Sequence, residues 1–511
     1  MRLEELIRVI NPSETGNSLA LEIEGLCCDS RQVRPGGLFF ALRGAATDGH
    51  DFIAAARERG AVAVVLDDPS RAPEGMTWLK SDDARLAMSK AAAAFYGNPT
   101  DGIPVVGITG TNGKTTTTYL VEAIMARAGI PAAVFGTISY RFGDQIIPAP
   151  HTTPESVDLQ RTIRELVDSG ARGVVMEVSS HALEQRRVDG CRFDVGVFSN
   201  LTRDHLDYHK DMESYFASKA RLFTELLAPD ASKPRRVAAI NVDDPYGARL
   251  AGAAVAPVVS YGLSSAAIVR ADEVSFSVNG ISGTMVTPNG TAPFHSQLLG
   301  RFNLYNILAS AAAGIGLGLP LKAILDGIEG NVRVPGRLER VNNDCGVTVL
   351  VDYAHTGDAL ENVLKTVAEI ATGRIITVFG CGGDRDRGKR PVMGEIAARS
   401  SDLAIVTSDN PRTENAGAII DEILGGIRPL GLREYAADEL SADFDTRGFT
   451  AVESRRDAIR LAARVARSGD IVLLAGKGHE DYQIIGTVKH HFDDREEAAA
   501  AFGQISSVGQ G

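Results

Sequence analysis

The chain has few cysteines and no long hydrophobic run. Its five cysteines are odd in number and show no spacing typical of a metal site: they are Cys27, Cys28, Cys191, Cys345 and Cys381. This usage indicates a reducing compartment. No run of about 18 apolar residues occurs, so we expect no membrane span. The first ten residues, MRLEELIRVI, lack the continuous hydrophobic region of a signal peptide, and we therefore expect a cytoplasmic protein.

The sequence also lacks an excess of positive charge. Its 53 Lys and Arg residues face 65 Asp and Glu residues, which gives a formal net charge of -12 at pH 7. We expect no nucleic-acid partner that binds through a basic surface, although local clusters can still hold an anionic small ligand. Neither solenoid-length repeats nor low-complexity segments occur. Apolar residues at 44% and charged residues at 23% are ordinary for a globular protein.

Turn-forming residues divide the 511-residue chain, which is too long for one core and favours about three domains. A cluster of turn formers at 97–104 ends the first block, and NVRVPGR at 331–337 has the composition of a hinge before the third. Between them strand and helix patterns alternate, with a strand-rich insert over 258–297 and a helix over 303–317. The alternation predicts an α/β protein with mostly parallel sheets. We predict three domains, at 1–100, 101–334 and 335–511.

A glycine-rich stretch in the second block, GITGTNGKTTTT at 107–118, follows a strand pattern and opens a helix pattern. Glycines let backbone N–H groups approach phosphate oxygens, and a helix amino terminus favours anions. Lys114 would contact the β- and γ-phosphates, and Thr115 would offer its hydroxyl to Mg²⁺. Ile108 stands at the first glycine position of the nucleotide-binding motif, and a plain glycine-rich turn is the alternative. The strand–loop–helix context favours nucleotide binding, with these candidates: Gly110, Thr111, Asn112, Gly113, Lys114, Thr115 and Thr116.

Two further stretches of the same block carry candidate polar groups. Glu177 ends a strand pattern, where it is either a metal ligand beside the phosphate loop or an ordinary strand-end glutamate. Thr153 and Pro154 form a typical helix start, with the hydroxyl capping the helix and the proline in its first position. The alternative is that hydroxyls in this stretch contact phosphate.

Two histidines and a lysine stand in unusual places in the second half of this block. His205 and His209 are spaced i, i+4 and either face one metal or lie on the surface, and for His209 we expect a surface position. Lys219 is four residues from both Tyr215 and Phe223, which places it on the aromatic face of a helix. It is therefore either a buried lysine with a shifted pKa and a chemical role, or one whose ammonium reaches water.

Polar clusters follow all four of the best strand patterns in the third block. They are Asp352 with His355, Asp384 with Arg385, Asp409 to Arg412, and Lys477 with His479 and Glu480. Any one cluster is an ordinary solvated loop, but parallel strands bring their carboxyl ends to one edge of a sheet. Four clusters on one edge therefore predict one binding site. In it Arg412, after the Asn410–Pro411 turn, would hold a carboxylate with its fork of donors.

Seven motifs, in this order along the chain, resemble those of the Mur ligase family, ATP-dependent enzymes that add amino acids to the cytoplasmic peptidoglycan precursor. They are GTNGKT at 110–115, EVSSH at 177–181, LTRDHLDYH at 201–209, YFASK at 215–219, GRFNLYN at 300–306, VPGRLE at 334–339 and DYAHT at 352–356. The match covers nearly the whole chain. It implies an amino-terminal α/β domain for the UDP end, a central ATPase domain with the phosphate loop, and a Rossmann-like carboxyl-terminal domain for the incoming amino acid.

Within the family the chain is similar to members that add the third residue to UDP-N-acetylmuramoyl-L-alanyl-D-glutamate. The implied contacts to this UDP-dipeptide are Ser30, Thr47, Thr152, Thr153, Ser179, Gln185 and Arg187. The implied ligands of two Mg²⁺ ions are Thr115, Glu177, His205 and Lys219, the last as a CO₂-derived carbamate. The implied ATP contacts outside the glycine-rich loop are Asn303, Asn306, Arg337 and Asp352. The implied catalytic residues are Lys114, His205 and Lys219. A carbamate supplies the anionic oxygen that an ammonium lacks, and it forms on a neutral amine.

The DNPR stretch at 409–412 has the pattern of family members that use meso-diaminopimelate. The implied contacts to this amino acid are Arg385, Asp409, Asn410, Pro411, Arg412, Gly476 and Glu480. Diaminopimelate ends in a second amino–carboxyl centre, whose carboxylate Arg412 can hold in a bidentate pair, whereas lysine ends in a bare ammonium. Glu480 suits an ammonium. Gly357 stands where proline is common in the family, and His151, at a position that varies, is given no role.

The resemblance implies a defined reaction. The γ-phosphate of ATP passes to the D-glutamyl γ-carboxylate, and the amine of diaminopimelate attacks the acyl-phosphate. We expect a monomer whose domains close around ATP, the UDP-dipeptide and diaminopimelate. An L-lysine-adding ligase, an enzyme like folylpolyglutamate synthetase and a nucleotide-hydrolysing switch are the alternatives. An enzyme like folylpolyglutamate synthetase does not explain DNPR. A nucleotide-hydrolysing switch would turn over ATP without an acceptor.

Overall fold

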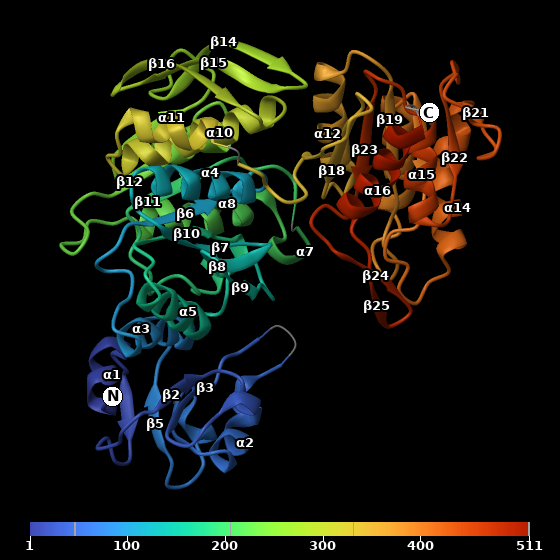
Figure 1. The fold of residues 1–511 in the computed structure, drawn as a ribbon. Coiled ribbons are helices and arrows are strands. Elements are labelled where there is room, and N and C mark those ends of the chain that lie inside the picture. Colours follow the sequence, from blue (N-terminus) through green and yellow to red (C-terminus); the bar gives the residue numbers. More distant parts are fainter. Residues whose placement is uncertain (45–46, 205, 331, 509–511) are drawn as a thin grey trace. The chain divides into compact units, whose positions relative to one another are not determined.

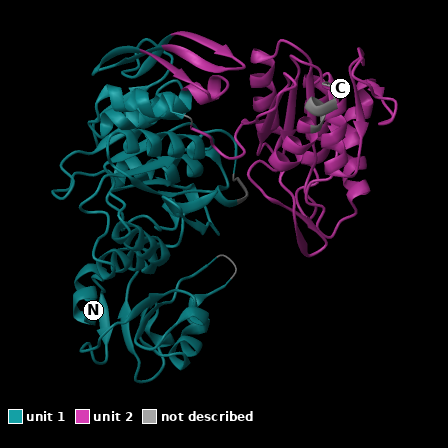
Figure 2. Cartoon of the chain, viewed as in Figure 1, with its two compact units in different colours: residues 1–272, 284–292, 305–330 teal, residues 273–283, 293–304, 331–511 magenta. Residues whose placement is uncertain are grey.

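The computed structural model describes residues 1–44, 47–204, 206–330 and 332–508. The chain forms two compact units, and each is described by itself. Figure 2 colours the first, which has residues 1–272, 284–292 and 305–330, teal, and the second, which has residues 273–283, 293–304 and 331–511, magenta. Parallel sheets covered by helices confirm the predicted α/β class in both units, whereas the three predicted domain boundaries stay a prediction.

The first sheet lies near the amino terminus and has the order β1-β5-β4-β3-β2 (Figure 1). Its strands are β1 (Glu14–Gly16), β2 (Gly25–Cys27), β3 (Gly37–Phe40), β4 (Ala61–Leu66) and β5 (Thr77–Lys80). The α-helices beside it are α1 (Leu3–Ile10), α2 (Ile53–Glu58) and α3 (Ala84–Phe95). Strands β2 to β5 are mutually parallel and β1 pairs antiparallel with β5. In α1 the spacing of Leu3, Leu6 and Ile10 buries one face against this core.

The second sheet has the order β13-β12-β11-β6-β10-β7-β8-β9. Its strands are β6 (Val105–Thr109), β7 (Ala132–Phe135), β8 (Ser139–Phe142), β9 (Gln145–Pro148), β10 (Gly173–Glu177), β11 (Val195–Phe198), β12 (Val237–Asn241) and β13 (Val258–Tyr261). All pairings from β13 to β7 are parallel, and β8 and β9 add an antiparallel hairpin at the edge. The centre of the sheet is apolar on both faces, as parallel sheets require.

Helices cover this sheet and connect its strands. They are α4 (Lys114–Arg127), α5 (Ser156–Asp168), α6 (Ser180–Glu184), α7 (Leu206–His209), α8 (Met212–Arg221), α9 (Pro245–Ala251), α10 (Arg301–Gly316) and α11 (Leu321–Glu329). Helix α4 packs against β6, β7 and β10, and α11 packs on α4. A small separate sheet has the order β14 (Arg270–Ser277), β15 (Gly280–Thr287), β16 (Gly290–Ser296). The predicted strand-rich insert included 258–261, which instead forms an edge strand of the parallel sheet, because β13 pairs with β12.

The third large sheet lies wholly in the second unit and has the order β17-β18-β23-β19-β20-β22-β21. Its strands are β17 (Glu339–Val341), β18 (Thr348–Asp352), β19 (Ile375–Phe379), β20 (Leu403–Val406), β21 (Arg433–Glu434), β22 (Gly448–Ala451) and β23 (Ile471–Ala475), and a hairpin of β24 (Tyr482–Ile485) and β25 (Val488–His491) follows. Only β17 pairs antiparallel within the described part of this sheet. The helices are α12 (Gly357–Ile370), α13 (Lys389–Ser400), α14 (Ala416–Ile427), α15 (Arg455–Val465) and α16 (Asp494–Val508).

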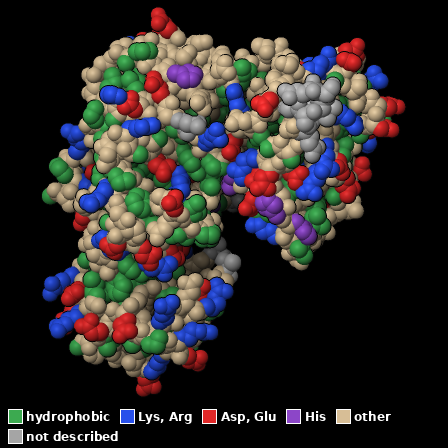
Figure 3. All heavy atoms as spheres, in the orientation of Figure 1, with side chains coloured by type: hydrophobic (Ala, Val, Ile, Leu, Met, Phe, Trp, Pro, Cys, Tyr) green, Lys and Arg blue, Asp and Glu red, His purple; other side chains and the backbone are tan. Residues whose placement is uncertain are grey.

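Two apolar layers sandwich this third sheet. Side chains from α12, α13 and α14 fill one layer, and side chains from α15 and α16 fill the other. On the face drawn in Figure 3, acidic and basic side chains are interspersed and do not gather by sign. Within the described residues, no helix is both long enough and apolar enough to cross a membrane.

Candidate active site

The glycine-rich loop joins β6, which ends at Thr109, to α4, which begins at Lys114. Gly110 has φ 145° and Gly113 has φ 88°, a region that side chains disfavour, and a Cβ on Gly113 would lie 2.3 Å from Asn306 Oδ1. The Lys114 ammonium donates to the carbonyls of Gly110 and Thr111 at 3.0 and 2.9 Å. The predicted strand–loop–helix is confirmed, and its backbone has the form that holds phosphate.

A second loop, after β11, brackets the glycine-rich loop. The Asn112 N–H donates to Asn200 Oδ1 at 2.9 Å, and the Thr202 N–H donates to Thr111 Oγ1 at 3.0 Å. Asn200 was not among the predicted residues. Its signal in the sequence is its position directly after a buried strand of the same parallel sheet, where ligand-binding side chains gather.

Lys219 on α8 is buried, with 1% of its surface exposed. Its ammonium donates to the Gly110 carbonyl at 2.8 Å and lies 4.6 Å from the centre of the Tyr215 ring. Burial, and then the nearby Lys114 charge, hold the pKa of Lys219 well below its usual range. The prediction of a buried lysine is confirmed, and the alternative of an ammonium reaching water is wrong. His205, predicted beside it as a ligand, lies outside the described residues.

Glu177 is 1% exposed and ends β10, the neighbour of β6 in the sheet. Its carboxylate accepts from the N–H and the hydroxyl of Thr137, both at 3.0 Å. Thr137 was missed, because nothing in the sequence links it to a residue 40 positions away. The hydroxyl of Thr115, a buried residue in the first turn of α4, and the carboxylate of the buried Glu177 at the end of β10 are oxygen donors that fit Mg²⁺. Among the described residues no three His, Cys, Asp or Glu side chains cluster as a metal site.

The predicted helix start at Thr153 and Pro154 is wrong. Helix α5 begins at Ser156 with Glu155 as its N-cap residue, and no side chain caps it. The Thr153 hydroxyl instead donates to the Glu177 carbonyl at 2.8 Å and accepts from the Ser179 N–H at 3.1 Å. The threonine therefore ties the segment before α5 to the end of β10.

Other predicted substrate residues lie around these hydrogen bonds of Thr153. Thr152 shares a hydroxyl contact of 3.1 Å with Thr137, and Ser179 caps α6. Arg187 donates to the Thr153 carbonyl at 2.9 Å and to Gln185 Oε1 at 2.8 Å. The structure therefore brings together five of the predicted UDP-dipeptide residues: Thr152, Thr153, Ser179, Gln185 and Arg187.

The two residues predicted at the uridine end lie in the amino-terminal part of the first unit. Ser30 is buried in the first turn of a short 3₁₀ helix that Asp29 caps. Thr47 is exposed, and its carbonyl accepts from the Gly44 N–H at 2.9 Å. No described contact joins Ser30 and Thr47 to each other, so their common role stays a prediction.

His209 is buried, with 3% of its surface exposed, and the predicted surface position is wrong. Its Nε2 lies 2.8 Å from Ser180 Oγ, and its Nδ1 lies 3.1 Å from the Glu184 carboxylate. These contacts join the end of α7 to α6. The helical pattern around His209 gave no sign of burial, because its partners come from another helix.

In the second unit the four predicted strand ends share one edge. Strands β18, β23, β19 and β20 are adjacent and parallel, and Asp352, Ala475 and Phe379 lie in register. This confirms the predicted gathering of polar clusters. The carboxylate of Asp352 accepts from the Leu338 and Ala354 N–H groups at 2.7 and 2.8 Å. Burial raises the pKa of Asp352, although the Arg337 charge opposes the shift.

A fully buried lysine organises this edge. Lys477 Nζ lies 3.1 Å from Asp409 Oδ1, and it donates to Asn410 Oδ1 at 3.2 Å and to the Tyr482 carbonyl at 2.6 Å. Burial acts to raise the pKa of Asp409, but the Lys477 charge, the Arg455 charge and the Lys477 hydrogen bond together outweigh it, and the net pKa is lowered. Burial and the Asp409 charge raise the pKa of Glu480, which accepts from Asn410 Nδ2 at 3.0 Å.

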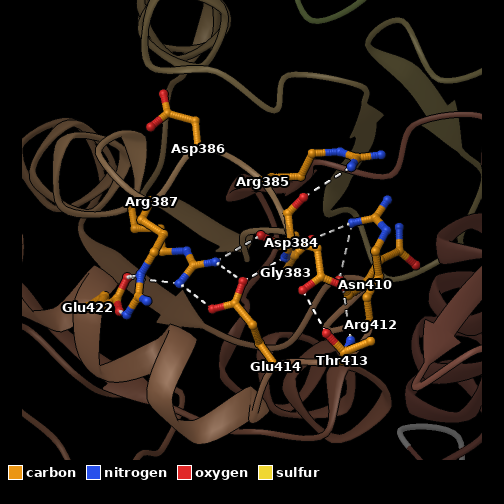
Figure 4. Close-up of polar contacts among 12 residues, drawn as sticks. Gly383, Asp384, Arg385, Asp386, Arg387, Asn410, Arg412, Thr413, Glu414 and Glu422 are labelled. Atoms are coloured by element: carbon orange, nitrogen blue, oxygen red, sulfur yellow. Dashed lines mark hydrogen bonds and ion pairs between the residues drawn. The ribbon is translucent and has the colours of Figure 1, made fainter.

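Arg412 is held in a costly backbone conformation with φ 51°. The hairpin fixes this conformation, because the Arg412 N–H donates to the Ile484 carbonyl at 3.1 Å and the Gly486 N–H donates to the Arg412 carbonyl at 2.7 Å. Its guanidinium donates to the Gly383 carbonyl at 2.8 Å (Figure 4). In this view the guanidinium of Arg385 lies on the same side of the two loops as the guanidinium of Arg412.

The predicted ATP residues outside the glycine-rich loop divide between the units. Asn306 lies with the loop in the first unit, where its Oδ1 accepts from the Thr117 hydroxyl at 3.4 Å. Asn303, Arg337 and Asp352 belong to the second unit. Asn303 donates to the Leu299 carbonyl at 2.8 Å. Their common role stays a prediction.

Comparison with known proteins agrees with this geometry. Residues 22–96 match the model described as Mur ligase family, catalytic domain, residues 108–314 match Mur ligase middle domain, and residues 336–478 match Mur ligase, glutamate ligase domain. A UDP-N-acetylmuramoyl-L-alanyl-D-glutamate–2,6-diaminopimelate ligase of Geobacter metallireducens is 84% identical over 511 residues, which is 100% of both chains. The ligase of the same name from Geobacter sulfurreducens is 77% identical over 502 residues, 98% of this chain and 99% of its own.

A solved structure of a ligase with that name has the same fold along its length. It aligns over 98% of both chains with a TM-score of 0.72 and 33% sequence identity. The three matched models together span most of the chain, in the order of the motifs found in the sequence. The chain belongs to the Mur ligase family.

Proposed function

We propose that the chain is an ATP-dependent ligase that joins meso-diaminopimelate to the D-glutamate γ-carboxyl of UDP-N-acetylmuramoyl-L-alanyl-D-glutamate in cytoplasmic peptidoglycan precursor synthesis. The observation that carries the proposal is full-length identity of 84% to a ligase named for this reaction. The DNPR stretch at the shared strand edge supports it, because Arg412 stands where a second carboxylate would need a partner.

The reaction balances in two steps. A carboxylate oxygen of D-glutamate forms a bond to the γ-phosphorus of ATP, and ADP leaves. The amine of diaminopimelate then bonds to the acyl carbon, phosphate leaves, and the amine loses a proton. Lys114 and the N–H groups of the glycine-rich loop bind and orient the triphosphate for the first step.

We further propose two Mg²⁺ sites. Thr115 and Glu177 would hold one Mg²⁺, and Lys219, as a carbamate, would hold a second with His205. When bound, Mg²⁺ offsets the charge of two anions that must meet, the triphosphate and the carboxylate. Burial lowers the pKa of Lys219 and so favours the neutral amine, which is the form that takes up CO₂.

The amino-acid site selects for two charged ends. The Arg412 fork would bind the distal carboxylate, and Arg385 lies on the same side of the loops. Glu480, beside Asn410, would face the distal ammonium. L-Lysine lacks the second carboxylate and would leave a guanidinium without its partner. We further propose a monomer with domains at 1–100, 101–334 and 335–511 that close around the substrates, which scattering with and without ATP and UDP-dipeptide tests.

The test is product formation by the purified protein with ATP, Mg²⁺ and the UDP-dipeptide, given meso-diaminopimelate or L-lysine in separate reactions. Tripeptide and phosphate should form in equal amounts with diaminopimelate. Product with lysine instead would keep the ligase and overturn the assignment of Arg412. Phosphate release without any acceptor would favour a nucleotide-hydrolysing switch.

A further inference from the structure

The two loops that carry Arg385 and Arg412 are joined by a charge network built around one buried arginine. One loop follows β19 and the other follows β20. Arg390, at the start of α13, has a side chain that is 0% exposed. Its guanidinium binds both oxygens of Glu414, with distances of 3.0 and 2.8 Å. It also donates to the Gly382 carbonyl at 3.3 Å, so one side chain reaches both loops.

Glu414 itself bridges the loops. Its Oε1, which accepts from Arg390 Nη2, also accepts from the Asp384 N–H at 2.6 Å (Figure 4). The Asp384 carboxylate reaches back and accepts from the hydroxyl and the N–H of Thr413 at 2.8 and 3.2 Å. The Gly383 N–H donates to the Asn410 carbonyl at 2.9 Å. Every contact in this set crosses from one loop to the other.

The network holds a costly backbone in place. Asp384 has φ 53° and Arg412 has φ 51°, so each loop contains one residue in the left-handed region. Such conformations persist where the surroundings over-determine them. The loops also meet too closely for a side chain between them, because a Cβ on Gly383 would lie 1.9 Å from the Pro411 carbonyl oxygen.

Stability alone does not account for an arrangement of this kind. Buried ion pairs often add little to stability compared with apolar side chains of the same volume. A bidentate arginine–carboxylate pair does fix geometry, because its two parallel hydrogen bonds allow one orientation. The hydrogen bonds from Arg390 and from the Asp384 N–H also hold the pKa of Glu414 down to about 2, so the brace is ionised at any physiological pH.

We propose that Arg390 and Glu414 are positioning residues that lock the two loops into one body, so that selection of diaminopimelate over lysine depends on this brace as well as on Arg412. The proposal rests on the proposed function, and it assigns selection to residues that do not touch the substrate. The brace sets the positions of the Arg385 and Arg412 guanidiniums before the amino acid arrives, which lowers the cost of ordering them on binding.

Glu422 offers a matched control for Glu414. It accepts from the same Arg390 Nη1 at 2.8 Å and pairs with Arg387, but it lies on α14 and has no described contact with the Arg412 loop. We expect Glu414→Gln to raise the KM for diaminopimelate about 10- to 100-fold, with kcat and the KM values for ATP and UDP-dipeptide within about twofold. Glu422→Gln should leave kcat and the three KM values within about twofold of the wild type. The preference for diaminopimelate over lysine should fall in the first variant alone.

Two further measurements keep the test decisive. Hydrogen exchange in residues 380–388 and 408–415 should speed up in Glu414→Gln and not in Glu422→Gln, and this readout does not depend on any substrate. If Glu414→Gln does not fold, Thr413→Val removes one cross-loop bond, and it should raise the KM for diaminopimelate about 3- to 10-fold. Equal behaviour of Glu414→Gln and Glu422→Gln in kinetics and exchange would overturn the brace. Failure of the wild-type protein to use diaminopimelate would overturn the proposed function, and exchange would then decide the brace by itself.

Discussion

Two lysines, Lys219 and Lys477, are almost completely buried and differ in what surrounds them. Lys219 donates to the Gly110 carbonyl and lies over the Tyr215 ring, and among the described residues no carboxylate is within ion-pair distance of it. Lys477 lies 3.1 Å from Asp409 and also contacts an amide oxygen and a backbone carbonyl. The side chain and its burial are the same, but of the two lysines only Lys477 has an ion pair among the described residues.

The difference separates a reactive group from an organising one. Burial and the Lys114 charge lower the pKa of Lys219 and outweigh the opposing Asp204 charge, which favours the neutral amine, the form that can react. Beside Asp409, an ammonium offsets a buried negative charge and fixes the loop that follows β20. Burial of a lysine therefore indicates chemistry only where its charge is not compensated. Each of the following predictions tests that distinction.

The largest effect is expected from Lys219→Met. The substitution replaces a buried amine that has no described ion pair by an apolar side chain of similar length, so stability should be unchanged or higher. We expect ligase turnover to fall about a thousandfold, because the proposed anionic oxygen beside the phosphates is lost. Saturating kcat and denaturant unfolding measure the two results. Retention of more than a tenth of the activity would contradict a chemical role for Lys219.

Lys477→Met should show the reverse order of effects. It leaves the Asp409 charge buried without a partner, and we expect a loss of about 3–5 kcal/mol in the free energy of unfolding. The double variant Lys477→Met with Asp409→Asn should recover part of that loss, since the remaining charge is gone. Unfolding in urea measures all three proteins. A single variant as stable as the wild type would show that the pair does not set the stability of this edge.

Glu480 should make diaminopimelate use sensitive to acid. Burial and the Asp409 charge raise the pKa of Glu480. As the pH falls, Glu480 is therefore protonated at a higher pH than an ordinary glutamate. The neutral form cannot hold an ammonium, and kcat/KM for diaminopimelate should fall through that raised pKa. Glu480→Gln should lower the maximal kcat/KM for diaminopimelate about tenfold and remove its fall at acid pH. An unchanged fall at acid pH in the variant would assign the titration to another group.

The sequence predicts the glycine-rich loop well because the strand, turn and helix that form it are local. The strand, the glycines and the start of α4 lie within residues 107–118. The common strand edge could also be predicted, because parallel strands align their ends whatever the helices between them do. The resemblance to a family added roles that spacing alone left open, such as the choice between metal binding and an ordinary glutamate for Glu177.

Distant partners explain what the sequence did not predict. Thr153 and Pro154 have the local pattern of a helix start. The Thr153 hydroxyl instead accepts a hydrogen bond from the N–H of Ser179, which is 26 residues further along the chain. His209 is buried by Ser180, which is 29 residues earlier in the chain. The brace of Arg390 and Glu414 likewise joins two loops whose proximity only the sheet order reveals. Tertiary contacts override local patterns at these positions.

The smallest effect is expected from Tyr215→Phe, which tests the cause of the Lys219 shift. The ring under the ammonium stays, and so does the burial that is the first cause of the lowered pKa. The hydroxyl, whose pKa burial raises to about 12, contacts the Thr111 hydroxyl at 3.3 Å, a weak link to the glycine-rich loop. We expect kcat to fall no more than about threefold. A loss as large as that of Lys219→Met would mean that the tyrosine hydroxyl, and not desolvation, prepares the amine.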